Sequence, residues 1–197
     1  RKVRCEANGG VRGARPARLA AATGATLSSR LQLVSAPAIN SSRFETVRIE
    51  RSERPMLSVV VDTEEEFDWT KPFDRNATGV SHMREIGRLQ GAFEGCGIVP
   101  TYVIDYPIAT RQESIRPLKE YAEAGRAVIG AHLHTWVTPP FEEEVTVRNS
   151  FQGNLTRELE RAKLRELRER IGEAFGAAPV IFKAGRYGIG KNSHGLL

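Results

Sequence analysis

Acidic and imidazole side chains follow three short apolar runs of the sequence, and these residue types commonly bind divalent metals. In chain order, the residues concerned are Asp62, Glu64, Glu65, Asp105, His132 and His134. Carboxylate oxygens and imidazole nitrogens together form a ligand set that proteins use for zinc and similar cations. In an extended segment, side chains two residues apart point to the same side, so His132 and His134 could bind one cation. The pattern therefore predicts a metal site.

Each of these features has a simpler interpretation when it is taken alone. The acidic run of residues 64–66 could be a solvated loop, and Asp105 could cap a helix. Trp69 and Trp136 could be ordinary core or loop aromatics, although at a polar rim they would also suit stacking on a sugar ring. The occurrence of carboxylates and histidines after three separate apolar runs favours one shared site.

Strand and helix signals alternate from Met56 onward, and this alternation would bring the reactive side chains together. The expected strands cover residues 57–61, 98–104, 127–131 and 179–183, and the expected helices cover residues 81–94, 114–124 and 156–175, with a further helix beginning near residue 192. Such repeats give parallel strands whose carboxyl ends share one edge. A (β/α) barrel and an open doubly wound sheet both fit. The acidic run after the first strand replaces a glycine-rich phosphate loop, which disfavours nucleotide binding.

Residues 1–55 differ from the rest of the sequence in charge and in pattern. They contain 11 Lys and Arg against 4 Asp and Glu, whereas residues 56–197 contain 18 basic and 20 acidic residues. The net charge of +5 thus belongs to the leading segment, whereas a nucleic-acid binder would carry its basic patch on the folded domain. We expect a disordered or non-native basic leader, either a transit peptide or translated sequence upstream of Met56. Residues 43–50 could add a short edge strand.

The sequence also bears on compartment and cysteine chemistry. No apolar run approaches the roughly 18–20 residues that a membrane span needs. No secretory signal is visible, so we favour the cytoplasm. Cys5 and Cys96 lack the paired spacing of a zinc site, and we expect two free thiols.

Residues 56–197 resemble the polysaccharide deacetylases of the NodB-homology type, carbohydrate esterase family four, in three motifs. Residues 62–69 read Asp-Thr-Glu-Glu-Glu-Phe-Asp-Trp, residues 132–136 read His-Leu-His-Thr-Trp, and residues 182–188 read Phe-Lys-Ala-Gly-Arg-Tyr-Gly. The order and spacing of the motifs fit the family. The first two motifs are most similar to a branch of bacterial deacetylases linked to cell-wall or lipopolysaccharide sugars.

The resemblance implies a fold and a metal centre. The family fold is a deformed (β/α) barrel of roughly seven parallel strands, which would be incomplete in this chain. Family members bind one divalent metal, often zinc, through a carboxylate and two histidines. By position, Asp62 matches the catalytic base and His132 matches the first metal histidine. Glu64 is the best match for the metal carboxylate, with Glu65 as a close competitor.

Two positions depart from the family pattern. Trp136 stands where the second metal histidine usually lies, so His134 must take that role. The family's third motif contains an arginine that orients the base. Lys183 occupies its register and Arg186 lies three residues later, so either cation could hold Asp62 ionised.

Later motifs of the family supply an apolar pocket for the acetyl methyl group and a histidine general acid, and this sequence has no match for either. His194 follows the third motif too closely to be that acid. We therefore expect little deacetylase activity from this chain by itself. We also expect an open sheet edge that favours aggregation.

The expected function is a metal-dependent hydrolase of carbon–nitrogen amide bonds that removes acetyl groups from a (poly)saccharide, such as a cell-wall or cell-surface amino sugar. The expected partner is acetylated carbohydrate, and not nucleic acid. Substrate contacts are expected from Trp69, Asp105, Trp136 and Tyr187. Two other functions stay open: a non-catalytic carbohydrate- or metal-binding fragment of the same fold, and a glycoside hydrolase that uses Glu64 and Asp68 as its two carboxylates.

Overall fold

The computed structural model describes residues 56–197. The basic leader and the possible strand at residues 43–50 lie outside the described residues, so the expectations for them stay predictions.

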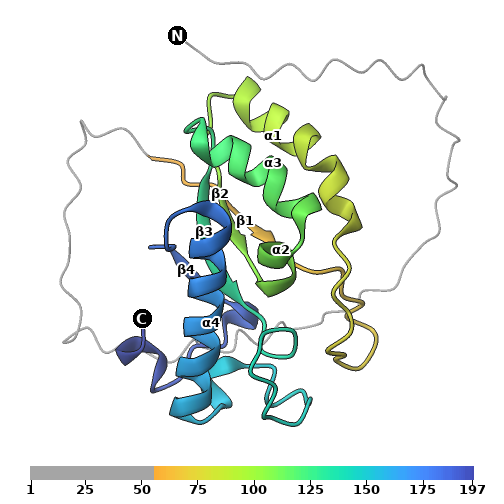
Figure 1. Ribbon diagram of the computed structural model, residues 1–197, viewed down its shortest axis with the longest axis vertical. Coiled ribbons are helices and arrows are strands. Elements are labelled where there is room, and N and C mark those ends of the chain that lie inside the picture. The colour runs from red at the N-terminus through yellow and green to blue at the C-terminus, as the bar shows by residue number, and fades with distance from the viewer. Residues whose placement is uncertain (1–55) are drawn as a thin grey trace, which may run out of the picture. The chain divides into compact units, whose positions relative to one another are not determined.

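Four parallel strands form the sheet of the described region (Figure 1). They are β1 (Val60–Thr63), β2 (Thr101–Ile104), β3 (Val128–Leu133) and β4 (Phe182–Ala184), and they lie side by side in chain order. The sheet curls like half of a barrel. The prediction of an α/β fold with parallel strands is therefore confirmed, and the complete seven-stranded barrel stays a prediction.

Helices connect successive strands. The elements are η2 (Ser81–Glu85) and α1 (Ile86–Gly95) before β2, α2 (Tyr106–Thr110) and α3 (Gln112–Glu123) before β3, and η3 (Gln152–Asn154) and α4 (Arg157–Phe175) before β4. Two short turns follow β4, η4 (Gly185–Tyr187) and η5 (Ser193–Gly195). The helix expected near residue 192 is thus only the three-residue turn η5.

The ends of α4 follow from local chemistry that the sequence displays. The Thr156 hydroxyl accepts the backbone N–H of Leu159 at 3.3 Å, which satisfies a free donor of the first turn. Gly176 ends the helix with a φ of 81°, a left-handed conformation that glycine adopts without steric cost. By contrast, no hydrophobic period in the sequence indicates α2. That short helix is capped by Asp105, whose side chain accepts the N–H of Ile108.

All four strands begin later than their apolar runs suggest, and all but β2 also end later. β2 begins at Thr101, because Pro100 has no N–H to donate to a ladder. β1 begins at Val60, which pairs with Thr101, and it extends to Thr63 opposite Ile104. β4 is likewise shifted from residues 179–183 to Phe182–Ala184. These shifts place the reactive residues within the strands or directly after them.

One face of the sheet packs against the helices and forms the hydrophobic core. Side chains alternate between the two faces of a strand, so every second strand residue enters this core. Its buried members include Ile86, Tyr102, Ile104, Leu118, Ala131, Leu133, Leu167 and Ile171. Burial of one large aliphatic side chain contributes about 1.5–3 kcal/mol, so this face accounts for much of the stabilisation.

The opposite face of the sheet carries the reactive side chains. Asp62 is in register with Val103, and His132 is in register with Lys183. Since these positions alternate with the core residues, they point away from the helices. The inner face of the curled sheet is therefore the site face.

A buried lysine fixes the segment that joins β3 to α4. Lys163 of α4 donates from Nζ to the carbonyl oxygens of Thr135, Thr138 and Pro140 at 2.9, 2.6 and 2.7 Å. The same ammonium lies 3.1 Å from the Glu143 carboxylate. This one side chain thus ties the segment directly after His134 to the helix.

Two remaining expectations concern cysteine and membranes. No cysteine among the described residues is free, so the expectation of a free thiol is wrong for Cys96, while Cys5 lies outside the described residues. No helix in residues 56–197 is long and apolar enough to cross a membrane.

Candidate metal centre

The site lies at the carboxyl ends of β1, β2 and β3. Asp62 and His132 are strand residues, whereas Glu64 and His134 come directly after β1 and β3. The structure therefore brings together residues that are about seventy positions apart in sequence, because parallel strands end at one edge.

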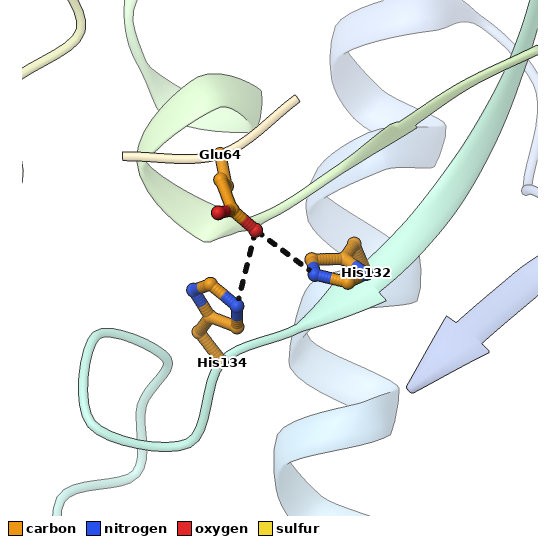
Figure 2. Close-up of side chains that lie close together, drawn as sticks. All are labelled: Glu64, His132 and His134. Atoms are coloured by element: carbon orange, nitrogen blue, oxygen red, sulfur yellow. Dashed lines mark ion pairs between the residues drawn. The ribbon is translucent and has the colours of Figure 1, made fainter. Parts of the chain in front are cut away.

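Glu64, His132 and His134 converge on one point (Figure 2). Glu64 Oε2 lies 3.1 Å from His132 Nε2 and 3.3 Å from His134 Nε2. The two imidazoles are buried, whereas the Glu64 side chain is 29 % exposed. The cluster is thus closed on the protein side and accessible to solvent through the carboxylate. The three residues form a group that could hold a metal ion.

The outer nitrogens of both histidines are already bound to acceptors. His132 Nδ1 lies 3.0 Å from the carbonyl oxygen of Lys183, and His134 Nδ1 lies 2.8 Å from Glu65 Oε2. Each Nδ1 must donate a hydrogen, because a carbonyl or carboxylate oxygen can only accept one. In the neutral imidazole the Nε2 atom then presents a lone pair, and both lone pairs face the Glu64 carboxylate.

The Glu64 carboxylate and the two Nε2 atoms can all donate electron pairs to one cation placed between them. Burial, as the largest effect, lowers the pKa of His134, which favours its neutral form. Burial alone would raise the pKa of Glu64, but its close contacts with His132 and His134 and the charge of Lys183 lower it. One carboxylate and two imidazole nitrogens form the donor set of a zinc site with an open position.

Glu65 and Asp105 form a second buried group behind His134. The two carboxylates and His134 Nδ1 could also surround a metal ion. However, Asp105 Oδ2 accepts the N–H of Glu65 at 2.8 Å, and Oδ1 accepts that of Ile108 at 3.0 Å. Burial, together with the hydrogen bond and charge of Glu65, raises the pKa of Asp105 well above its usual range, and burial raises that of Glu65. The backbone N–H groups of Glu65 and Ile108 thus engage both oxygens of Asp105.

Lys183 is the cation that reaches Asp62. Its Nζ donates to Asp62 Oδ2 and lies 4.8 Å from the centre of the Tyr187 ring. Burial alone would lower the pKa of Lys183, but the hydrogen bond and charge of Asp62 outweigh it and raise the pKa. The pair is accessible to solvent on the same face of the sheet as His132.

Arg186, the other candidate for this role, points elsewhere. Its guanidinium carbon lies 3.9 Å from the centre of the Phe151 ring, and its Nη1 donates to the Ser150 hydroxyl. The backbone of Arg186 has a φ of 54°, which is uncommon for a side chain other than glycine. In the described residues, Arg186 has no hydrogen bond or ion pair with Asp62.

The four expected substrate contacts divide into exposed and buried residues. Trp69 is 56 % exposed and Tyr187 is 82 % exposed, so both can contact a substrate. Trp136 is 1 % exposed and stacks on His134 with ring centres 4.3 Å apart, and Asp105 is fully buried. Neither Trp136 nor Asp105 offers a surface to a substrate in this structure; both support the site from behind.

Three site features carried no clear signal in the sequence. Phe73 packs against both Phe67 and Trp136, with ring centres 5.0 and 4.7 Å away. Gly185 lies so close to His134 that a Cβ atom would overlap the imidazole ring. In the sequence, Lys163 looks like one of several charged residues on the solvent-exposed face of a helix. The aromatic content of residues 67–73 and the glycine of the third motif were the available hints.

Comparisons with models of known protein families, with curated proteins and with solved structures found no match. The function therefore has to be inferred from the geometry of the site and from the resemblance of the motifs.

Proposed function

We propose that the chain belongs to a metal-dependent hydrolase that removes acetyl groups from a (poly)saccharide, with a cell-wall or cell-surface amino sugar as the substrate class. The observation that carries this proposal is the convergence of Glu64 Oε2 with the Nε2 atoms of His132 and His134. The resemblance of the three motifs to the deacetylase family is the reason for proposing an acetylated sugar as the substrate.

Glu64, His132 and His134 would hold one divalent metal, with zinc favoured by the mixed carboxylate and imidazole ligands. A metal bound there would lower the pKa of water from 15.7 towards about 7 and would polarise the acetyl carbonyl. Asp62 would accept the proton of the attacking water. Lys183 holds the Asp62 carboxylate in its orientation through a hydrogen bond.

Trp69 and Tyr187 would contact the sugar. Both rings are exposed, and Tyr187 lies beside Lys183, which places it near the proposed base. Aromatic rings with one accessible face suit the apolar faces of sugar rings. Arg186 lies 5.8 Å from the Trp69 ring centre and would hold that aromatic surface in place.

The described residues offer no evident acid for the leaving group. His82 lies beside Glu66 at 3.4 Å, and His194 is an exposed residue of η5. An amide nitrogen needs a proton to leave, whereas 4-nitrophenolate leaves without one. An activated acetyl ester therefore isolates the half of the reaction that Asp62 and the metal ligands would perform.

The test measures zinc-dependent hydrolysis of 4-nitrophenyl acetate by the 197-residue chain. We expect Asp62→Asn to lower the rate by about 10²–10⁴-fold, the usual contribution of a general base. His132→Ala should abolish the dependence on zinc, and His194→Ala should leave the rate unchanged. Acetate release from acetylated chito-oligosaccharides should stay low for the same chain. Equal rates for the parent, Asp62→Asn and His132→Ala would contradict the proposal.

The glycoside hydrolase alternative is less well supported. Asp68 accepts the N–H of Thr70 at 3.0 Å and pairs with Lys71 at 3.4 Å, so its carboxylate is engaged within its own turn. Glu64 faces two imidazoles, for which a two-carboxylate mechanism has no use.

A further inference from the structure

Glu65 stands between the proposed metal centre and the interior of the protein. Its Oε2 atom accepts the Nδ1 hydrogen of His134 at 2.8 Å, on the side of the ring opposite to Glu64. Glu65 is buried, and its backbone N–H donates to Asp105 Oδ2 at 2.8 Å. The residue therefore contacts His134 by its side chain and Asp105 by its backbone.

We propose that Glu65, held in place by Asp105, is a positioning residue that keeps His134 in the Nδ1–H tautomer and leaves its Nε2 lone pair for the metal. The metal half of this inference rests on the proposed function, whereas the tautomer half concerns the metal-free protein. Glu65 thereby has a role distinct from that of its neighbour Glu64, although both lie in one acidic run.

A single carboxylate, that of Asp105, fixes this part of the chain. Its two oxygens accept one backbone N–H from the segment after β1 and one from α2. The segment after β1 is thus bound to the first turn of α2. Successive side chains of an extended segment point to opposite sides, so Glu64 faces one nitrogen of His134 and Glu65 faces the other.

The His134 ring is also held on one face and on one edge. Trp136 stacks on it with an interplanar angle of 22°, and Gly185 lies against its carbon edge, where no Cβ would fit. With the ring plane fixed in this way, only the position of the hydrogen remains to be decided. Each ring nitrogen faces a carboxylate, and Glu65 is the nearer acceptor: its Oε2 lies 2.8 Å from Nδ1, whereas Glu64 Oε2 lies 3.3 Å from Nε2, so the hydrogen belongs on Nδ1.

The same contacts argue against a second metal ion in the group formed by Glu65, Asp105 and His134. Both oxygens of Asp105 already accept backbone N–H groups, and Glu65 Oε2 already accepts from His134. A cation would have to displace these hydrogen bonds in a fully buried place. The group is therefore a support for His134 and not a binding site of its own.

The first test is the tautomer of His134 in the metal-free, 197-residue chain, measured from the ring nitrogen chemical shifts by NMR. We expect hydrogen on Nδ1 and an unprotonated Nε2. Hydrogen on Nε2 would overturn the inference, whether or not the protein binds zinc. This measurement needs no variant, so a folding defect in a substituted protein cannot obscure it.

The second test compares zinc affinity by competition with a chromophoric chelator. Glu65→Met removes the acceptor at similar volume and should weaken zinc binding by about 10–100-fold, the usual effect of losing such a partner. Glu65→Gln keeps an acceptor oxygen and should recover part of the loss. Glu66→Met is the matched control, since Glu66 bonds with Ser81 and His82 and not with His134, and it should bind zinc like the parent.

The outcomes separate this inference from the proposed function. If the parent binds zinc and His132→Ala does not, but Glu65→Met binds as tightly as the parent, the positioning role fails and the metal centre stands. If the parent shows the Nδ1–H tautomer but no zinc binding, the proposed function fails and the role of Glu65 in setting the tautomer stands.

Discussion

Neighbouring residues of one acidic run have different partners, and these partners decide what each residue can do. Asp62 bonds with Lys183, Glu64 faces the two Nε2 atoms, and Glu65 lies behind His134. The motif resemblance placed Glu64 ahead of Glu65 as the metal carboxylate, but the residue pattern alone does not separate the two. The structural difference comes from Asp105 at the end of β2, which accepts the backbone N–H of Glu65 and holds that residue in the interior.

The choice between Lys183 and Arg186 was equally beyond the sequence. Both follow the fourth strand, and either could serve as the cation for Asp62. The left-handed backbone at Arg186 and the Phe151 ring direct the guanidinium away from the base. A left-handed backbone is expected at glycine, so no residue pattern in the sequence predicts it at an arginine.

A pair of substitutions tests this difference at the residue scale. We expect Lys183→Met to lower zinc-dependent hydrolysis of 4-nitrophenyl acetate by about 10-fold or more, because Asp62 loses the hydrogen bond that orients its carboxylate, and each 1.4 kcal/mol is a factor of ten. Arg186→Met, the matched loss of a cation nearby, should lower the rate by less. If Arg186→Met lowers the rate constant as much as Lys183→Met or more, Lys183 is not the cation that supports the base.

At the scale of elements, the alternation of strands and helices was readable because apolar residues recur with clear periods. The three long helices and four strands were expected, with shifts of a few residues at the strand ends. α2 was not expected, because five residues with a proline carry no period. The segment from Thr135 to Glu143 was not predictable either, since it is shaped by Lys163 from the next helix.

Substitution of Lys163 tests how strongly that helix holds the segment. Lys163→Met would leave three carbonyl oxygens and the Glu143 carboxylate without their shared cation. We expect a loss of about 3–5 kcal/mol in the free energy of unfolding, the usual cost of removing one partner of a buried ion pair. Urea denaturation followed by circular dichroism measures the change, and Lys191→Met, at an exposed lysine, serves as the control. A loss below about 1 kcal/mol would mean that the segment holds itself in place.

At the scale of the whole described region, the proposed metal would join β1 to β3 across β2. Its ligands come from segments that are brought together only by the completed sheet, so the unfolded chain has no such site. Binding to the folded state alone stabilises by about 2.7 kcal/mol when the free metal is at 100 times its Kd. The described part of the sheet has no further strand beside β1 or β4, and Leu57, Val60 and Val180 are exposed there.

The most direct measurement is an anomalous difference map at the zinc absorption edge from crystals of the zinc-loaded protein. The account predicts one peak bounded by Glu64, His132 Nε2 and His134 Nε2, at about 2.0–2.2 Å from each ligand atom. A peak between Glu65, Asp105 and His134 Nδ1, or no peak near either histidine, would contradict the central claim that Glu64 and the two histidines form the metal centre.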